Sequence, residues 1–252
     1  NMITKGLVVL PTQGFANRLK MIASSYIYAS MIDIPLYICW DKVNECNIAY
    51  DQIFQCIPNI STVLFEDVKK SNYCYFGRVH TNTIFRSIEA VIEDKDNEYE
   101  YILIEGGHEF KHDKLSRIEF ISKKCSFYNS IQFTEPILSK VDSYINSNFD
   151  FFSQKHKVVI HHRNIIEEYD SLDVKHNSVV HFDNNSPIEA FCKYIRMIKL
   201  SECDKILIVS NSSSSKELFS NQCPNISFIT TPTTSYERNE TEDMIQSIVD
   251  FI

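Results

Sequence analysis

The stretch from Lys5 to Asp33 constrains the fold more than any other part of the sequence. Gly6 to Leu10 is a short apolar run, which is typical of a parallel strand covered on both faces. Pro11 to Gly14 interrupts this run, because proline cannot donate to a strand ladder and glycine permits a tight turn. From Asn17 onward, apolar residues recur at three- and four-residue steps, which predicts a long helix.

A strand, a polar turn and a helix in this order are typical of an anion site. The positive end of the helix dipole and free backbone N–H groups then lie at the carboxyl edge of a sheet. The turn offers one glycine, one amide and two cations, in Gly14, Asn17, Arg18 and Lys20. It is neither a G-x-G-x-x-G fingerprint nor a Walker loop, which disfavours a NAD-dependent dehydrogenase. An ordinary helix start with solvated cations remains the alternative.

Strands and helices alternate along the rest of the chain. Apolar strand patterns are predicted at Pro35–Trp40, Thr62–Glu66, Tyr101–Glu105, Val158–Ile160, Lys205–Val209 and Ile226–Thr230. The helical patterns between them predict two α/β units with parallel sheets. A polar, aromatic connection between Asn148 and Lys155 places the boundary, with an N-terminal domain at 1–152 and a C-terminal domain at 153–252.

Composition excludes several classes of function. The formal charge of −8 over 252 residues argues against bulk nucleic-acid binding. The sequence has no apolar run of about 18 residues and no signal segment, so we expect a cytoplasmic or soluble protein without a membrane segment. An upstream anchor is left open because Asn1 precedes Met2. The eight cysteines form no C-x-x-C pair, which predicts a reduced intracellular chain without a metal site.

Polar clusters follow three of the predicted strands, at Gly14–Lys20, His161–Asn164 and Ser210–Ser213. In open α/β sheets, ligands bind just beyond the carboxyl ends of the strands. The planar guanidinium of Arg163 can hold a diphosphate and neutralise a departing leaving group. The serine turn can present hydroxyl and N–H groups to a phosphate or a ribose. Together the clusters predict a nucleotide or sugar-nucleotide site.

Several residues are candidates for acid–base chemistry. His161 and His162 are adjacent on a strand and should face opposite sides, so one of them can support the site without acting in it. His108 and Glu109 follow the Tyr101 strand and are candidate general bases, with a polar loop as the alternative. Glu167 begins an acidic run that is also typical of a solvated face.

These motifs resemble, in order, those of the fucosyltransferase-like glycosyltransferases. Leu10 to Lys20 resembles the G-F-x-N-R-L motif, and Trp40, Asp41, Cys46 and Tyr50–Phe54 are similar to the W…C…F-x-D-L-F stretch that follows it. His161-His162-Arg163 matches H-x-R, and Ser210-Asn211-Ser212 resembles the T/S-D-x turn. Glu240 to Ile252 resembles the helix with the V-D-L-L pattern, which puts Asp250 at the aspartate position.

The resemblance implies a GT-B-like fold, with two Rossmann-like domains facing a central cleft. It implies an inverting, metal-independent glycosyltransferase without a cofactor other than its nucleotide-sugar donor. The donor would lie on the C-terminal domain and the glycan acceptor on the N-terminal one. Arg163 would clamp the diphosphate, Asn17 and Arg18 would face the reaction centre, and the base is left open among His108, Glu109, Asp41 and Glu167. Donor-binding positions would be Gly14, Phe15, Ala16, His161, His162, Ser210, Asn211, Ser212, Ser213 and Asp250.

The sequence departs from the family pattern at three places. Asn164 and Ile166 replace the second arginine and the aspartate of H-x-R-R-x-D, and Asn211 replaces the aspartate of the third motif. The terminal S-x-F-S segment has no counterpart before Ile252, through truncation or a short C-terminal domain. The resemblance implies GDP-fucose as the donor, and the departures around Arg163 and Asn211 make a UDP-sugar such as UDP-xylose the alternative. A catalytically silent glycan- or nucleotide-binding module is the alternative from another class.

Overall fold

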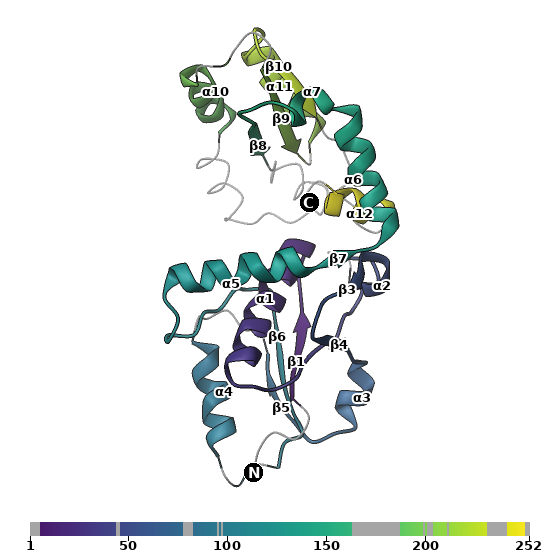
Figure 1. Cartoon of the computed structure of the whole chain (residues 1–252), viewed down its shortest axis with the longest axis vertical. Helices are drawn as coiled ribbons and strands as arrows, with labels where there is room; N and C mark the ends of the chain where they lie inside the picture. The colour runs from purple at the N-terminus through teal and green to yellow at the C-terminus, as the bar shows by residue number, and fades with distance from the viewer. Residues whose placement is uncertain are drawn as a thin grey trace. The chain divides into compact units, whose positions relative to one another are not determined.

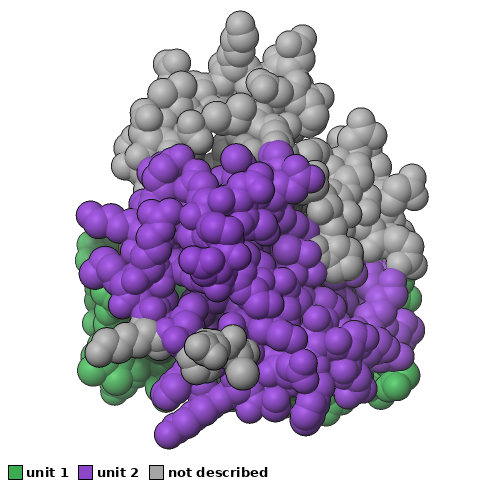
Figure 2. Space-filling model, turned by 90° about the horizontal axis from the view of Figure 1, so that it is seen from above, with its two compact units in different colours: residues 1–135 green, residues 136–252 purple. Residues whose placement is uncertain are grey.

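The computed structural model describes residues 6–43, 46–77, 83–94, 96, 98–162, 187–198, 200, 204–210, 212–230 and 241–249. The chain divides into two compact units, residues 1–135 and 136–252, which are coloured separately in Figure 2. No helix in these described ranges has both the length and the apolar character needed to cross a bilayer.

A five-stranded, wholly parallel sheet forms the centre of the first unit (Figure 1). Its spatial order is β4 (Ile60–Thr62), β2 (Leu36–Ile38), β1 (Gly6–Pro11), β6 (Tyr101–Gly106) and β5 (Tyr73–Phe76). From β1 the chain adds β2 and β4 on one side of the sheet, and then β5 and β6 on the other side, where β6 pairs with β1. This reversal makes the carboxyl end of β1 a topological switch point, where open α/β sheets bind their ligands.

The central strand is buried because helices cover it. Leu7, Val8 and Val9 of β1 are fully buried, as the apolar run predicts. Helix α1 (Phe15–Met31) packs on β1, and α5 (Arg117–Ser130) packs on α1, with the Tyr26 and Phe127 rings 5.0 Å apart. The described part of this unit also contains α2 (Tyr50–Ile53), α3 (Phe65–Lys69) and α4 (Ile84–Glu93). A short antiparallel pair joins β3 (Phe54–Cys56) to β7 (Gln132–Phe133).

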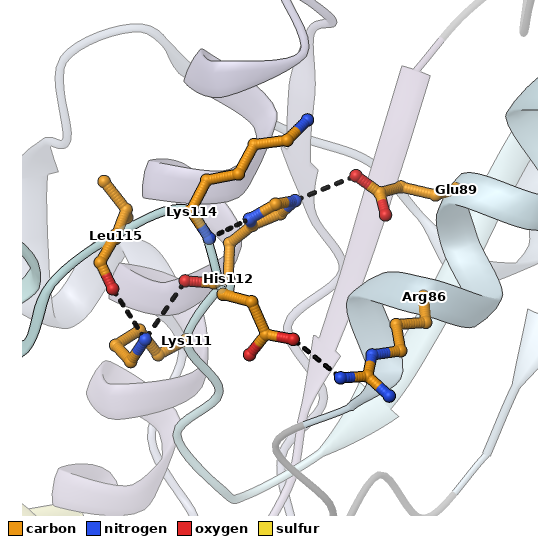
Figure 3. Close-up of polar contacts among 7 residues, drawn as sticks. Arg86, Glu89, Lys111, His112, Lys114 and Leu115 are labelled. Carbon is orange, nitrogen blue, oxygen red and sulfur yellow. Dashed lines mark hydrogen bonds and ion pairs between the residues drawn. The ribbon is translucent and has the colours of Figure 1, made fainter.

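The segment after β6 is fastened to α4 by a buried histidine (Figure 3). His112 Nδ1 accepts the Lys114 backbone N–H at 2.9 Å, so Nε2 carries the ring proton and donates to Glu89 at 2.8 Å. The ring is 5% exposed and lies against Phe85 and Tyr28, at centroid distances of 4.6 and 6.0 Å. These contacts hold the segment that leads from β6 to α5.

The second unit contains a three-stranded parallel sheet with the order β10 (Ser227–Thr230), β9 (Lys205–Ser210) and β8 (Val158–His162). Helices α10 (Ile188–Met197) and α11 (Ser213–Gln222) contribute Cys192, Ile195 and Phe219 to an apolar cluster on one face of this sheet. The described residues also form α6 (Glu135–Ser147), α7 (Phe149–Phe152) and α12 (Thr241–Val249).

Two features differ from the sequence interpretation. The predicted strand at Thr62–Glu66 is wrong: β4 ends at Thr62, and Phe65 begins a helix in which Glu66 pairs with Lys69. Acidic residues in the first turn and a lysine in the last favour that helix. The boundary along the chain falls between Glu135 and Pro136, earlier than residue 152. Residues 136–152 belong to the second unit because α7 packs on β9 and Asp150 pairs with Lys205 at 3.1 Å.

Candidate active site

The turn after β1 is fastened to the end of β6 at the carboxyl edge of the first sheet. The Thr12 N–H donates to the Gly106 carbonyl at 2.8 Å. Gln13 then adopts the left-handed region, with a φ of 67°. Gly107 lies against it, since a Cβ at Gly107 would come within 2.8 Å of Gln13 Cδ. Gly14, with a φ of −69°, occupies the N-cap position of α1.

The two predicted side chains at the start of α1 both turn back to Gln13. Asn17 Nδ2 donates to Gln13 Oε1 at 2.7 Å, and Arg18 Nε donates to the Gln13 carbonyl at 2.9 Å. Arg18 Nη1 also donates to the Asp41 carbonyl at 2.7 Å, and its guanidinium lies 4.6 Å from the centre of the Trp40 ring. Arg18 is fully buried. It therefore joins the turn after β1 to the segment after β2 instead of pointing into solvent.

Aromatic side chains surround Arg18 and fill the space beside the start of α1. Trp40 packs edge-on against Phe54 and Tyr50, at 5.9 and 6.0 Å, and its indole N–H donates to the Ile48 carbonyl at 2.8 Å. Phe15, predicted as a donor-binding residue, is buried and stacks on Phe54 at 6.2 Å. Its ring is part of the core. Gly14 and Ala16, predicted beside it, are half-buried.

The four candidate bases have different surroundings. His108 and Asp41 follow β6 and β2 at the carboxyl edge, and both side chains are exposed. Glu109 is ion-paired with Lys124 of α5. Glu167 lies outside the described residues. Among the candidates that the structure describes, His108 and Asp41 are the exposed ones.

In the second unit, His161 and His162 face opposite sides of β8, as predicted. His161 is exposed, whereas His162 is buried with its ring 5.7 Å from both Phe191 and Phe219. In the sheet register, His162 pairs with Ser210, the last residue of β9. The two strand ends that were predicted to share a site are therefore neighbours.

The serines after β9 build the start of α11. Ser212 Oγ accepts the Ser215 N–H at 3.2 Å as the N-cap and lies 2.8 Å from Ser214 Oγ. The Ser212 N–H donates to Ser210 Oγ at 3.2 Å. Ser215 Oγ is buried without a hydrogen-bond partner among the described residues. The Ser210 and Ser212 hydroxyls therefore organise the helix start, and the positive end of α11 lies at the carboxyl edge of the sheet.

A hollow of about 430 Å³ lies along the same helix. Its lining includes Lys216, Glu217, Ser220, Asn221 and Thr230, the last residue of β10. This volume is within the range of small-molecule sites. Arg163, Asn211 and Asp250 lie outside the described residues, as does the side chain of Ser213. Within the described ranges, no group of three or more His, Cys, Asp and Glu side chains is placed to hold a metal ion.

Comparison with known proteins gives matches among solved structures. No family profile and no curated protein matches the sequence. The alpha-1,6-fucosyltransferase NodZ, in a crystal soaked with GDP-fucose, superimposes with a TM-score of 0.62 at 16% identity, over 98% of this chain and 84% of NodZ. A variant of FUT1 from Arabidopsis thaliana in complex with GDP gives 0.61 at 12% identity, over 98% of this chain and 63% of FUT1.

The chain has the fold of these fucosyltransferases. POFUT1 in complex with GDP matches as well, with a TM-score of 0.52 at 12% identity, over 94% of this chain and 88% of POFUT1. The predicted GT-B-like fold class, with parallel α/β sheets, is confirmed.

Two residues at the carboxyl edge of the first sheet, Gln13 and Gly107, were not predicted as site residues from the sequence. Gln13 was noted only as part of the turn, because a left-handed glutamine has no sequence signature. Gly107 carried a readable signal, since a Gly-Gly pair after an apolar strand indicates close approach of another backbone or side chain.

Proposed function

We propose that this protein is an inverting, metal-independent glycosyltransferase that moves fucose from GDP-fucose to a glycan hydroxyl. The observation that carries the proposal is the likeness in fold, over 98% of the chain, to a fucosyltransferase soaked with GDP-fucose. The polar residues at the carboxyl edges of both parallel sheets support it, because such edges bind ligands in α/β folds.

In this proposal, the second unit (136–252) holds the donor. Arg163 follows β8 directly in sequence, where its guanidinium can pair with two oxygens of the diphosphate. The start of α11 adds the positive end of a helix dipole beside the same strands. The hollow lined by Lys216 and Thr230 offers room for another part of the nucleotide. Charge on the leaving GDP is then neutralised by the protein's own groups without a metal ion.

The first unit (1–135) takes the glycan acceptor. Inversion requires the acceptor hydroxyl to attack the sugar carbon on the face opposite GDP, while a base removes its proton. His108 and Asp41 are our candidates, because their side chains are exposed at the carboxyl edge. Glu109 would first have to leave Lys124. Arg18 positions the turn after β1, since its guanidinium is committed to two backbone carbonyls.

A thermal-shift panel of GDP, UDP, GDP-fucose and UDP-xylose without added metal tests the donor. A ligand at a hundredfold its Kd stabilises the native state by about 2.7 kcal/mol, which is readily measured. We expect a shift that is selective for GDP and GDP-fucose. A UDP-selective shift would keep the fold but replace the donor.

Transfer of fucose to a glycan array, followed as GDP release, tests the reaction. Arg163→Ala should abolish transfer and leave the Tm unchanged, whereas Arg117→Ala removes an exposed arginine at the start of α5 and should change neither. GDP affinity without transfer or donor hydrolysis would identify a silent binding module and contradict the proposal.

A further inference from the structure

Among the residues that the structure describes, three other than glycine adopt the left-handed region, and one of them differs from the other two. Asp33 and Asn59, with φ values of 53° and 61°, precede β2 and β4 at the amino edge of the first sheet. Asp and Asn tolerate this conformation, because their short polar side chains bond to the local backbone. Gln13, with a φ of 67°, follows β1 at the carboxyl edge, and glutamine is not among the favoured types.

The surroundings of Gln13 hold both its backbone and its side chain in place. Its carbonyl accepts from Arg18 Nε at 2.9 Å, and its Oε1 accepts from Asn17 Nδ2 at 2.7 Å. Gly107 leaves room for the amide, since a Cβ there would approach Gln13 Oε1 to 2.8 Å. Glycine at position 13 would adopt this backbone at lower cost. The amide side chain is therefore what Gln13 contributes.

The side chains of Gln13 and Asn17, here called the amide pair, have polar atoms left over. Within the described part of the chain, their mutual hydrogen bond is the only one that either side chain makes, and both residues are half-buried. Because Asn17 donates with Nδ2 and Gln13 accepts with Oε1, the remaining groups are Gln13 Nε2, a donor, and Asn17 Oδ1, an acceptor. The amide pair thus offers one donor and one acceptor, and a sugar hydroxyl can pair with either because it both accepts and donates.

We propose that the amide pair binds hydroxyl groups of the acceptor sugar and that Gln13 is a specificity-determining residue. The proposal rests on the function proposed above and assigns part of the acceptor site to Gln13, which directly precedes the G-F-x-N-R-L residues. The rigid turn fixes the direction of both amides before the sugar arrives. An acceptor that lacks the contacted hydroxyl would leave these half-buried groups unpaired and be rejected.

Substitutions at Gln13 separate the amide from the backbone conformation. Gln13→Met keeps the size of the side chain and removes both polar atoms. Gln13→Glu keeps an oxygen for Asn17 and replaces the free donor by a charged carboxylate oxygen, which accepts. Gln13→Gly removes the side chain and relieves the left-handed backbone. We expect each to raise the acceptor KM about tenfold, as for one lost hydrogen bond of about 1.4 kcal/mol, with the donor KM unchanged.

Asp33→Gly and Asn59→Gly are the matched controls, because they change the other two left-handed residues, at the amino edge of the same sheet. All three glycine variants should keep the Tm within about 3 °C of the native value. Only Gln13→Gly should lose acceptor affinity. A native acceptor KM in Gln13→Met and Gln13→Gly would overturn the proposal.

A series of mono-deoxy acceptors distinguishes recognition of a hydroxyl from a structural role of Gln13, because a structural role would not change the discrimination between acceptors. The native protein should discriminate against one deoxy acceptor by about tenfold, and Gln13→Met should lose that discrimination. Equal discrimination in both proteins would show that Gln13 does not read a hydroxyl.

NMR titration keeps the inference testable without turnover. Methyl glycosides added to the native protein should move the side-chain amide resonances of Gln13 and Asn17 and leave that of Asn59 unchanged. No movement at saturating glycoside would refute the amide pair as a sugar site. Failure of the proposed function has a different signature, because the native protein would then show no nucleotide-dependent shift and no transfer.

Discussion

Replacement of Arg18 by methionine tests whether this arginine acts in the chemistry or in the structure. The variant keeps the apolar stem but loses the hydrogen bonds to the Gln13 and Asp41 carbonyls, at 2.9 and 2.7 Å, and the contact with Trp40. Hydrogen bonds to a charged group contribute about 1.5–3 kcal/mol each, and a desolvated cation–π contact about 2 kcal/mol.

These losses are partly offset, because the variant no longer buries a charge, which costs several kcal/mol. The expected net destabilisation is about 2–4 kcal/mol. With an m-value of about 2 kcal/mol per molar, the urea midpoint should fall by about 1–2 M. Trp40 reports this unfolding directly, because it is the only tryptophan of the chain and lies under the guanidinium.

Lys20→Met is the control, since Lys20 is an exposed cation on the same helix. Its urea midpoint should stay at the native value. A native midpoint for Arg18→Met would refute the structural role of Arg18. If that variant also lost transfer, Arg18 would belong among the catalytic residues.

Three further predictions concern other parts of the fold. His112→Phe should destabilise the first unit by about 2 kcal/mol in urea unfolding, because the Lys114 N–H and the Glu89 carboxylate lose their partner; an unchanged midpoint would contradict this. Ser212→Ala should lower the free energy of unfolding by about 1 kcal/mol in calorimetry, because the Ser215 N–H loses its N-cap acceptor. The control Ser126→Ala, in the exposed middle of α5, should show no such loss. Burial, helped by the charge of Asp41, raises the pKa of the Cys39 thiol from 9.0 to about 11. The folded-state pKa of Cys39 lies above its unfolded value, so its contribution to the free energy of unfolding is complete below about pH 9 and is lost as the pH rises towards 11. Cys39→Ala should therefore flatten this alkaline decline of the urea midpoint.

Local patterns predicted much of the fold. The apolar run of β1, the periodicity of α1 and the later strands at Tyr101 and Lys205 indicated parallel α/β units, and the structure contains both sheets. The positions of polar clusters at strand ends were also readable, because parallel strands bring their carboxyl ends to one edge. Periodicity reports which positions are apolar and where a strand ends.

The environment of each polar side chain was decided only by tertiary structure. Arg18 and Phe15 belong to the same motif as Asn17, yet both are buried. Arg18 donates to the Asp41 carbonyl, and Phe15 stacks on Phe54. Their partners lie 23 or more residues away in sequence, where no local pattern records them. The left-handed backbone of Gln13 depends likewise on the return of Gly107 from β6. Sequence thus determined the elements and the edge where polar groups gather, whereas long-range packing determined which of those groups are buried in the structure and which remain available to a ligand.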